Sequence, residues 1–354
     1  MALTFHSLSI ASVQNLTEDA AEITLNVPLH LTGTFRFLAG QYLTLKANIN
    51  GEEIRRSYSL CSAPYEGLYK VGIKRVANGL FSNYAIDQLS VGNTIAVMPP
   101  MGNFKYIPDA NAKNHVVLIA AGSGITPILS IAKTILHEET NSSVSLFYGN
   151  KGFSHVMFAE ELENLKNTYL TRFRLFHIFS QESQGIPIQK GRIDRDRLAK
   201  LNQAFLSHDR IDSVYVCGPE EMILSVKDFY EASGINPKNI HFELFHSGSK
   251  PKTETSITQI ESTCEVELII DDDAITFQME PSDKSLLDAA QRAGADVPFA
   301  CKGGVCCTCK AKILEGSANM LVNYALEPDE VRAGYVLTCQ ALPSSKKIKV
   351  SFDE

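Results

Sequence analysis

The sequence predicts a multidomain protein with three folds in succession: an antiparallel β-barrel, an α/β domain with a parallel sheet, and an α+β domain of the β-grasp type. Strand-like runs fill the first third, strands alternate with helices in the middle third, and four cysteines gather near the C-terminus. We expect these domains at residues 1–110, 111–246 and 263–354, with a linker at residues 247–262.

The barrel is predicted from short apolar runs such as AEITLNV and GLYKVGIKRV, which turn residues separate. Two polar stretches interrupt these runs. One is Arg56–Ser62, RSYSLCS, and the other is Gly79–Ser82, GLFS. Taken alone, each stretch is also typical of an ordinary edge strand or turn, so the residues themselves leave a purely structural role open.

The middle domain begins with a continuous apolar run, His115–Ala121, which is typical of a parallel strand buried on both faces. A glycine turn at Gly122 and Gly124 follows, and then a helix with Thr126 as its N-cap and Pro127 at its first position. Free N–H groups and the helix dipole at such a turn favour a phosphate group. Pro127 stands where a G-x-G-x-x-G motif has its third glycine.

Further strands and helices alternate up to SVYVCGP, in which Cys217-Gly218-Pro219 follows a strand. Ligands of parallel sheets lie beyond the carboxyl ends of the strands, where this turn is expected. Cys217 could equally be a small buried apolar residue. The strand HFELF closes the domain with Glu243 and Phe245, and a buried strand phenylalanine is the competing interpretation of Phe245.

The linker, SGSKPKTETSITQIES, is polar, contains Gly and Pro and has no apolar period. From Thr263 onward the chain has nine Lys and Arg against fifteen Asp and Glu, so most of the net charge of −7 lies there. This acidity argues against nucleic acid and suits a basic docking partner or simple solubility. The chain has neither a membrane-length apolar run nor an export signal, so we expect no membrane association and a cytoplasmic location.

Four cysteines have the spacing C-x4-C-x2-C followed by 29 residues and C, which is the plant-type ligand pattern of a [2Fe-2S] cluster. A reducing compartment disfavours disulfides, and a structural zinc site typically pairs two C-x2-C motifs. Cys307 breaks this spacing and is interpreted as a non-ligand. The predicted ligands are Cys301, Cys306, Cys309 and Cys339.

The motifs RSYSLCS, GLFS, AGSGITP and YVCGP occur in the order in which the ferredoxin–NADP reductase family has them, and the chain resembles that family. CKGGVCCTCKAKI and VLTC resemble plant-type ferredoxins. Together with NYALEPDEVRAGYVLTCQALP and HFELF, nearly the whole chain resembles the reductase subunits of ring-epoxidising phenylacetyl-CoA monooxygenases. The resemblance implies an NAD(P)H-dependent oxidoreductase that passes electrons through FAD and the [2Fe-2S] cluster to an oxygenase, expected to be a multi-subunit di-iron enzyme.

The resemblance also implies roles for the flavin residues. Arg56 would pair with the pyrophosphate of FAD, and Tyr58 would pack on the isoalloxazine ring. Ser59 would donate a hydrogen bond at flavin N5, which is the atom that receives the hydride. Gly79 and Ser82 would offer donors to phosphate.

On the nucleotide side, the resemblance implies that Cys217 lies near the nicotinamide C4, that Glu243 orients or moves a proton, and that Phe245 shields the flavin. It further implies nucleotide contacts from the two turns, at Gly122, Gly124, Thr126, Pro127, Gly218 and Pro219.

The nucleotide is expected to be NADPH, with NADH possible. Many NADP-specific relatives have Ser-Arg after the third strand, whereas here Ser180 precedes Gln181. Arg192, with Lys151, could supply the missing positive charge. Two alternatives stay open: the same electron transfer to a steroid or aromatic-ring oxygenase, and a non-catalytic redox-sensing scaffold.

Overall fold

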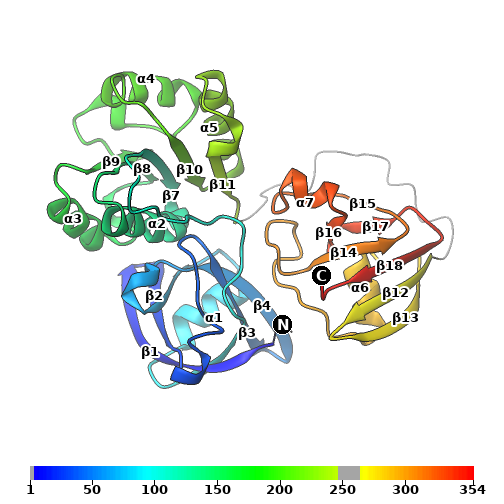
Figure 1. The fold of residues 1–354 in the computed structure, drawn as a ribbon. Coiled ribbons are helices and arrows are strands. Elements are labelled where there is room, and N and C mark those ends of the chain that lie inside the picture. The colour runs from blue at the N-terminus through cyan, green and yellow to red at the C-terminus, as the bar shows by residue number, and fades with distance from the viewer. Residues whose placement is uncertain (1–3, 246–263) are drawn as a thin grey trace.

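The computed structural model describes residues 4–245 and 264–354 (Figure 1). The predicted three-part architecture is confirmed. The predicted linker at residues 247–262 lies outside the described residues. No helix in the described ranges is both long and apolar enough to cross a membrane.

The first domain is a six-stranded antiparallel sheet with the strand order β4-β3-β6-β1-β2-β5. Apolar side chains that alternate along the strands, such as Leu8, Ile23 and Leu43, form its core. Helix α1 (Leu80–Gln88) contacts β3, β4 and β5. The strands are β1 (His6–Thr17), β2 (Ala20–Asn26), β3 (Tyr42–Ile49), β4 (Glu52–Ser59), β5 (Tyr69–Lys74) and β6 (Thr94–Val97).

The second domain has a five-stranded parallel sheet in the order β11-β10-β7-β8-β9. Helices α2 and α3 cover one face of the sheet, and α4 and α5 cover the other (Figure 1). Its strands are β7 (His115–Ala121), β8 (Ser143–Asn150), β9 (Phe173–Phe179), β10 (Ser213–Cys217) and β11 (Ile240–Glu243). Its helices are α2 (Ile125–Glu138), α3 (Ala159–Thr168), α4 (Arg195–Phe205) and α5 (Glu220–Ala232).

The start of α2 differs from the expectation, and the assignment of Thr126 as the N-cap was wrong. Gly124 is the N-cap, so Ile125 is the first helical residue and Pro127 the third. The reason is a 3₁₀ turn at Gly122–Gly124, which already brings the Ile125 N–H to the Gly122 carbonyl. The Thr126 hydroxyl instead donates to the carbonyl of Ser123 at 3.0 Å.

The third domain combines a mixed five-stranded sheet, in the order β13-β12-β18-β14-β16, with a β15-β17 pair. Ser285 accepts a hydrogen bond from the Asp288 N–H and caps α6, as its position before an apolar helix favours. The strands are β12 (Cys264–Ile270), β13 (Asp273–Met279), β14 (Lys310–Glu315), β15 (Ala318–Met320), β16 (Tyr335–Leu337), β17 (Ala341–Pro343) and β18 (Lys347–Ser351). The helices are α6 (Leu286–Arg292) and α7 (Pro328–Arg332).

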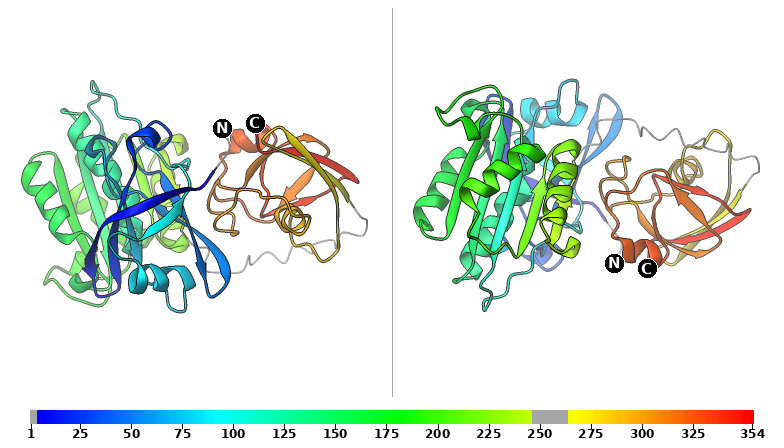
Figure 2. Two further views of the ribbon diagram at one scale, coloured as in Figure 1. Left: turned by 90° about the horizontal axis from the view of Figure 1, so that it is seen from below. Right: turned by 90° about the horizontal axis from the view of Figure 1, so that it is seen from above.

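The first two domains are joined by a buried ion-pair cluster. Lys133 on α2 is 4% exposed, and its Nζ lies 3.1 Å from a Glu66 carboxylate oxygen of the first domain. It also pairs with Glu161 of α3 and donates to the carbonyl of Cys61. The third domain lies beside both of the others, as the views in Figure 2 show. The domain junctions are therefore where residues far apart in sequence meet.

Candidate functional site

Three predicted catalytic residues meet where the first two domains join. Ser59, the last residue of β4, donates its hydroxyl hydrogen to Glu243 Oε2 at 3.0 Å. Glu243 lies opposite Cys217 in the β10–β11 ladder. Burial raises the pKa of Glu243 to about 8, and the Ser59 hydrogen bond only partly opposes this. Burial likewise raises the pKa of the Cys217 thiol, so both groups are mainly uncharged at neutral pH.

The two predicted nucleotide turns pack against each other at the carboxyl edge of the parallel sheet. A Cβ at Gly124 would collide with the backbone carbonyl of Cys217, and one at Gly218 would press on Met222 and Ala121. The glycines thus allow the close contact between the turn after β7 and the turn after β10. Pro219 is the N-cap of α5.

A buried amide at the same edge suits a polar ligand. The Nδ2 and Oδ1 atoms of Asn150, at the carboxyl end of β8, are buried without a hydrogen-bond partner among the described residues. The neighbouring Tyr148 hydroxyl donates to the carbonyl of Gly122 at 3.0 Å. Buried polar groups are normally satisfied, so an orphaned amide beside the glycine turn fits the binding of a nucleotide.

The predicted flavin residues lie along β4 and at the start of α1. Arg56 is exposed and has no carboxylate partner among the described residues, so its guanidinium suits an anionic group. The Tyr58 ring lies 5.7 Å from that of Phe81 on α1. Gly79 is the N-cap of α1, and Ser82 accepts a hydrogen bond from the Val76 N–H at 3.1 Å. These residues fit FAD.

A cavity of about 500 Å³ lies between β4 and the third domain. Arg56 and the predicted cluster ligand Cys301 both line it. Phe245, which is 38% exposed, follows Glu243 just after the end of β11. The candidate flavin residues therefore lie between the nucleotide turns and the cysteine loop.

The four predicted cluster ligands converge. Cys306 Sγ lies 3.1 Å from Cys301 Sγ, and the Gly303 N–H donates to Cys301 Sγ at 3.3 Å. Hydrogen bonds from Cys306 and from Cys339 lower the pKa of Cys301 and of Cys309, respectively. The same contacts raise the pKa values of Cys306 and Cys339.

The number and chemistry of these four side chains fit a two-iron cluster. Within residues 4–245 and 264–354, no group of three or more His, Cys, Asp or Glu side chains has the geometry to hold one metal ion. The four thiols form one connected set, with contacts of Cys306 to Cys301, Cys301 to Cys339 and Cys339 to Cys309, and a [2Fe-2S] cluster needs four thiolates on two irons. The Cys307 thiol donates to the carbonyl of Ala325 at 3.3 Å.

Arg192 lies away from the junction of the first two domains, where Ser59 meets Glu243. It is exposed, and it follows Gly191, whose N–H donates to the carbonyl of Phe179 at the end of β9. Lys151 at the end of β8 lies nearby, because the Gln181 N–H donates to its carbonyl. The two cations thus lie near the carboxyl ends of adjacent strands, where the far end of a dinucleotide would reach.

Contacts between the third domain and the other two were missed by sequence reasoning. Arg55, 6% exposed, donates to the carbonyl of Val297 and lies 4.1 Å over the Phe299 ring. The Tyr324 hydroxyl donates to Glu220 at the start of α5 at 2.8 Å. Each contact joins residues more than 100 positions apart, and no local pattern signals such a pairing.

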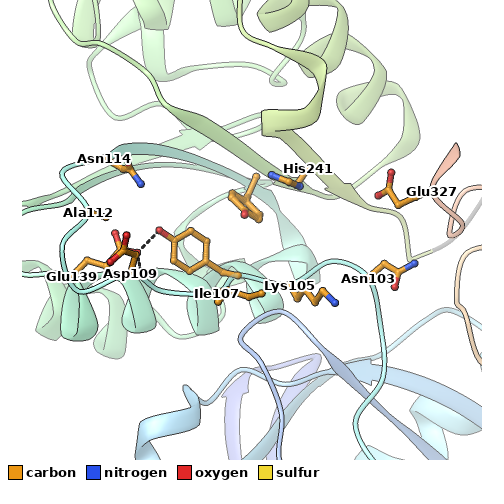
Figure 3. Close-up of a pocket in the computed structure, with 11 residues that line it drawn as sticks. Asn103, Lys105, Ile107, Asp109, Ala112, Asn114, Glu139, His241 and Glu327 are labelled. Carbon is orange, nitrogen blue, oxygen red and sulfur yellow. Dashed lines mark hydrogen bonds between the residues drawn. The ribbon is translucent and has the colours of Figure 1, made fainter. Parts of the chain in front are cut away.

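A separate cavity of about 550 Å³ is bounded by the segment 103–114 and β11 (Figure 3). The His241 ring stacks on Tyr215 at 4.4 Å, and the Tyr106 hydroxyl donates to Glu139 at 2.6 Å. None of the predicted site residues lines this cavity, so it is not part of the candidate site.

Comparisons with known families agree with this geometry. Residues 7–106 match the oxidoreductase FAD-binding domain, residues 118–228 the oxidoreductase NAD-binding domain, and residues 268–344 the 2Fe-2S iron-sulfur cluster binding domain. The predicted classes of cofactor, namely FAD, a nicotinamide nucleotide and a 2Fe-2S cluster, are thereby confirmed.

Similar proteins cover the whole chain. A subunit of the 1,2-phenylacetyl-CoA epoxidase from Escherichia coli K12 is 43% identical over 99% of this chain and 98% of its own. The ferredoxin reductase component of 3-ketosteroid-9-alpha-monooxygenase from Mycobacterium tuberculosis H37Rv is 33% identical over 98% and 96%. The solved structure of phthalate dioxygenase reductase is 25% identical, and its match covers 98% of both chains with a TM-score of 0.61.

Proposed function

This chain belongs to the family of oxygenase reductases that contains the matching subunit of 1,2-phenylacetyl-CoA epoxidase, and from that membership we propose that it carries electrons from NAD(P)H to an oxygenase. The observation that carries the proposal is the Ser59–Glu243 hydrogen bond, which joins the FAD-binding and NAD-binding domains where a hydride would pass. When bound, FAD converts a two-electron hydride into single electrons, and the [2Fe-2S] cluster is their outlet.

The flavin side of the mechanism uses residues of β4 and α1. The Arg56 guanidinium, which has no carboxylate partner among the described residues, would bind the FAD pyrophosphate, and Gly79 and Ser82 would border the same phosphates. Tyr58, whose ring lies against Phe81, would pack on the flavin ring. The Ser59 hydroxyl, which donates to Glu243, would border the flavin ring.

The nucleotide side uses the two packed turns. Gly122, Gly124 and Gly218 keep the backbone open to the nucleotide, and the first turn of α2, with Thr126 and Pro127, presents its N–H groups to phosphate. Cys217 and Pro219 would border the nicotinamide. Glu243, uncharged at neutral pH, orients the reacting groups without placing a negative charge beside a departing hydride. Phe245, which is partly exposed just after β11, would shield the flavin ring.

The third domain receives the electrons. Cys301, Cys306, Cys309 and Cys339 would hold the cluster, and Cys307, which donates to the carbonyl of Ala325, would stay outside it. The domains correspond to residues 1–110, 111–246 and 263–354 in this proposal.

We favour NADPH as the donor. Arg192 and Lys151 near the ends of β8 and β9 offer positive charge to a 2′-phosphate, although no Ser-Arg pair is present. The favoured acceptor is a multi-subunit di-iron oxygenase that acts on phenylacetyl-CoA, because of the 43% identity to the epoxidase subunit from Escherichia coli. The second candidate is a steroid oxygenase, which the 33% identity to the 3-ketosteroid reductase component supports.

An anaerobic titration tests the proposal. The protein, loaded with both cofactors, is titrated with NADPH and, separately, with NADH, and absorbance is followed. Bleaching of the flavin bands and then of the cluster bands is expected. A loaded protein that neither nucleotide bleaches would contradict the reductase function and leave the redox-sensing scaffold.

A further inference from the structure

The side chain of Tyr42, a residue of the FAD-binding domain, contacts the cysteine loop of the third domain, residues 301–309. Tyr42 is the first residue of β3, is 4% exposed and lies opposite Ser59 in the β3–β4 ladder. Its ring packs with Ala300 and Cys306 of the third domain. The same residue thus borders both the proposed flavin position and a proposed cluster ligand.

The Tyr42 hydroxyl makes two hydrogen bonds to the cysteine loop. It accepts one from the backbone N–H of Cys307 at 3.1 Å and lies 3.2 Å from the Thr308 hydroxyl. With the Cys307 N–H filling its acceptor side, the Tyr42 hydrogen is assigned to the bond with Thr308. Thr308 is fully buried, so its own hydrogen needs another acceptor.

The acceptor assigned to that hydrogen is the sulfur of Cys306, two residues earlier in the same loop, whose side chain packs against the Tyr42 ring. A hydrogen bond from Thr308 is also among the interactions that oppose the rise in the pKa of the Cys306 thiol. The contacts form a relay from the FAD-binding domain to a ligand sulfur: Tyr42 to Thr308, and Thr308 to Cys306. A donor that is itself hydrogen-bonded in this way is polarised and donates more strongly.

Hydrogen bonds to ligand sulfurs are one of the means by which a protein sets the reduction potential of an iron-sulfur cluster. The reduced cluster carries one more negative charge than the oxidised cluster. A donor on a ligand sulfur therefore stabilises the reduced form more and raises the potential. Tyr42 can exert this effect only while the third domain is docked, because it belongs to another domain.

We propose that Tyr42 is a positioning residue that orients the Thr308 hydroxyl toward Cys306 and so raises the cluster potential in the docked arrangement. The inference rests on the proposed function, since it assumes a cluster on the four cysteines. Docking of the third domain then favours electron transfer from the flavin to the cluster. Undocking lowers the potential of the cluster and makes it a stronger electron donor to the oxygenase.

The test is a potentiometric titration of the full-length, cluster-loaded protein with dithionite and redox mediators, read by electron paramagnetic resonance. Tyr42→Phe keeps the ring and removes the hydroxyl. It is expected to lower the equilibrium constant for cluster reduction about tenfold, which is a shift of about −59 mV for one electron. Thr308→Val is expected to give a shift of similar size.

The double variant separates a relay from two independent effects. Tyr42→Phe in the Thr308→Val background should cause no further shift, because the route to sulfur is already broken. The matched control is Tyr69→Phe, which removes a hydroxyl from β5 of the FAD-binding domain, where the Tyr69 ring lies against Phe35 and Phe37. Its potential should equal that of the unaltered protein.

An unchanged potential in Tyr42→Phe with an intact cluster, or fully additive shifts in the double variant, would overturn the inference. The titration needs neither NAD(P)H nor an oxygenase, so its result is independent of turnover. Shifted potentials in a protein that NAD(P)H cannot reduce would support the relay and contradict the reductase function. Normal reduction by NAD(P)H together with an unshifted potential in Tyr42→Phe would support the reductase function and contradict the relay.

Discussion

The hydroxyl of Ser59 donates a 3.0 Å hydrogen bond to the carboxyl group of Glu243, and these residues belong to different domains 184 positions apart. Burial raises the pKa of Glu243 to about 8, so the acceptor is uncharged at neutral pH. The bond therefore joins the FAD-binding and NAD-binding domains at the proposed hydride path without adding a negative charge there.

Glu243→Gln should flatten part of the pH dependence of stability. The pKa of the carboxyl group rises from 4.5 to about 8 on folding, so the folded protein loses stability as pH increases through that window, with no further loss above it. Glutamine cannot ionise. From pH 4.5 to pH 8 the Tm of the parent should therefore fall relative to the Tm of the variant. Thermal unfolding of both proteins in one buffer series measures this. A constant difference across the window would contradict the raised pKa.

Cys309→Ser should abolish the cluster and leave reduction of the flavin by NAD(P)H intact, because its thiol is a proposed ligand distant in sequence from every flavin residue. Absorbance and bound iron measure the outcome. The matched control is Cys307→Ser, which changes the adjacent thiol that bonds to Ala325 and should keep a normal cluster. A cluster retained in Cys309→Ser, or iron lost in Cys307→Ser, would show that the ligands were misassigned.

Lys133→Met should destabilise the junction of the first two domains. It leaves the carboxylates of Glu66 and Glu161 without their shared cation, and these are only 23% and 33% exposed. A loss of about 2 kcal/mol in the free energy of unfolding is expected. The control, Lys166→Met, breaks an exposed pair with Glu163 and should cost less than about 1 kcal/mol. Equal denaturation midpoints for the two variants would show that the buried ion-pair cluster of Lys133 does not stabilise the domain junction.

Gly124→Ala should destabilise the nucleotide domain by more than about 2 kcal/mol, since the added Cβ would collide with the carbonyl of Cys217. Urea denaturation measures this. Gly33→Ala is the control, because a Cβ at Gly33 meets nothing within 4 Å, and it should change stability by less than about 0.5 kcal/mol. A Gly124→Ala protein as stable as its parent would mean that the two turns can separate.

Arg192→Ala should reduce kcat/KM for NADPH about tenfold and leave that for NADH unchanged, if the guanidinium binds the 2′-phosphate. Steady-state reduction of an artificial acceptor measures both constants. Arg195→Ala, which removes an exposed arginine at the start of α4, is the matched control. Equal losses with both nucleotides would assign Arg192 a structural role.

The architecture could be predicted from the sequence because strand periodicity, the glycine turns and the cysteine spacing are local patterns. The start of α2 was misplaced by two residues, because the 3₁₀ turn at Gly122–Gly124 leads directly into a helix that begins at Ile125. The Tyr42–Thr308 contact could not be predicted at all. It joins residues 266 positions apart, and Tyr42 in the sequence is an ordinary strand tyrosine.

The contacts of Tyr42, Arg55 and Tyr324 with the other domains hold the third domain against both of its neighbours within one chain. Transfer between the flavin and the cluster is then a first-order process whose rate does not change on dilution. Delivery to a separate oxygenase is second-order and slows as either protein is diluted. At low protein concentration the flavin and the cluster would therefore be reduced faster than the oxygenase reoxidises them, and the reduced form of the reductase would accumulate.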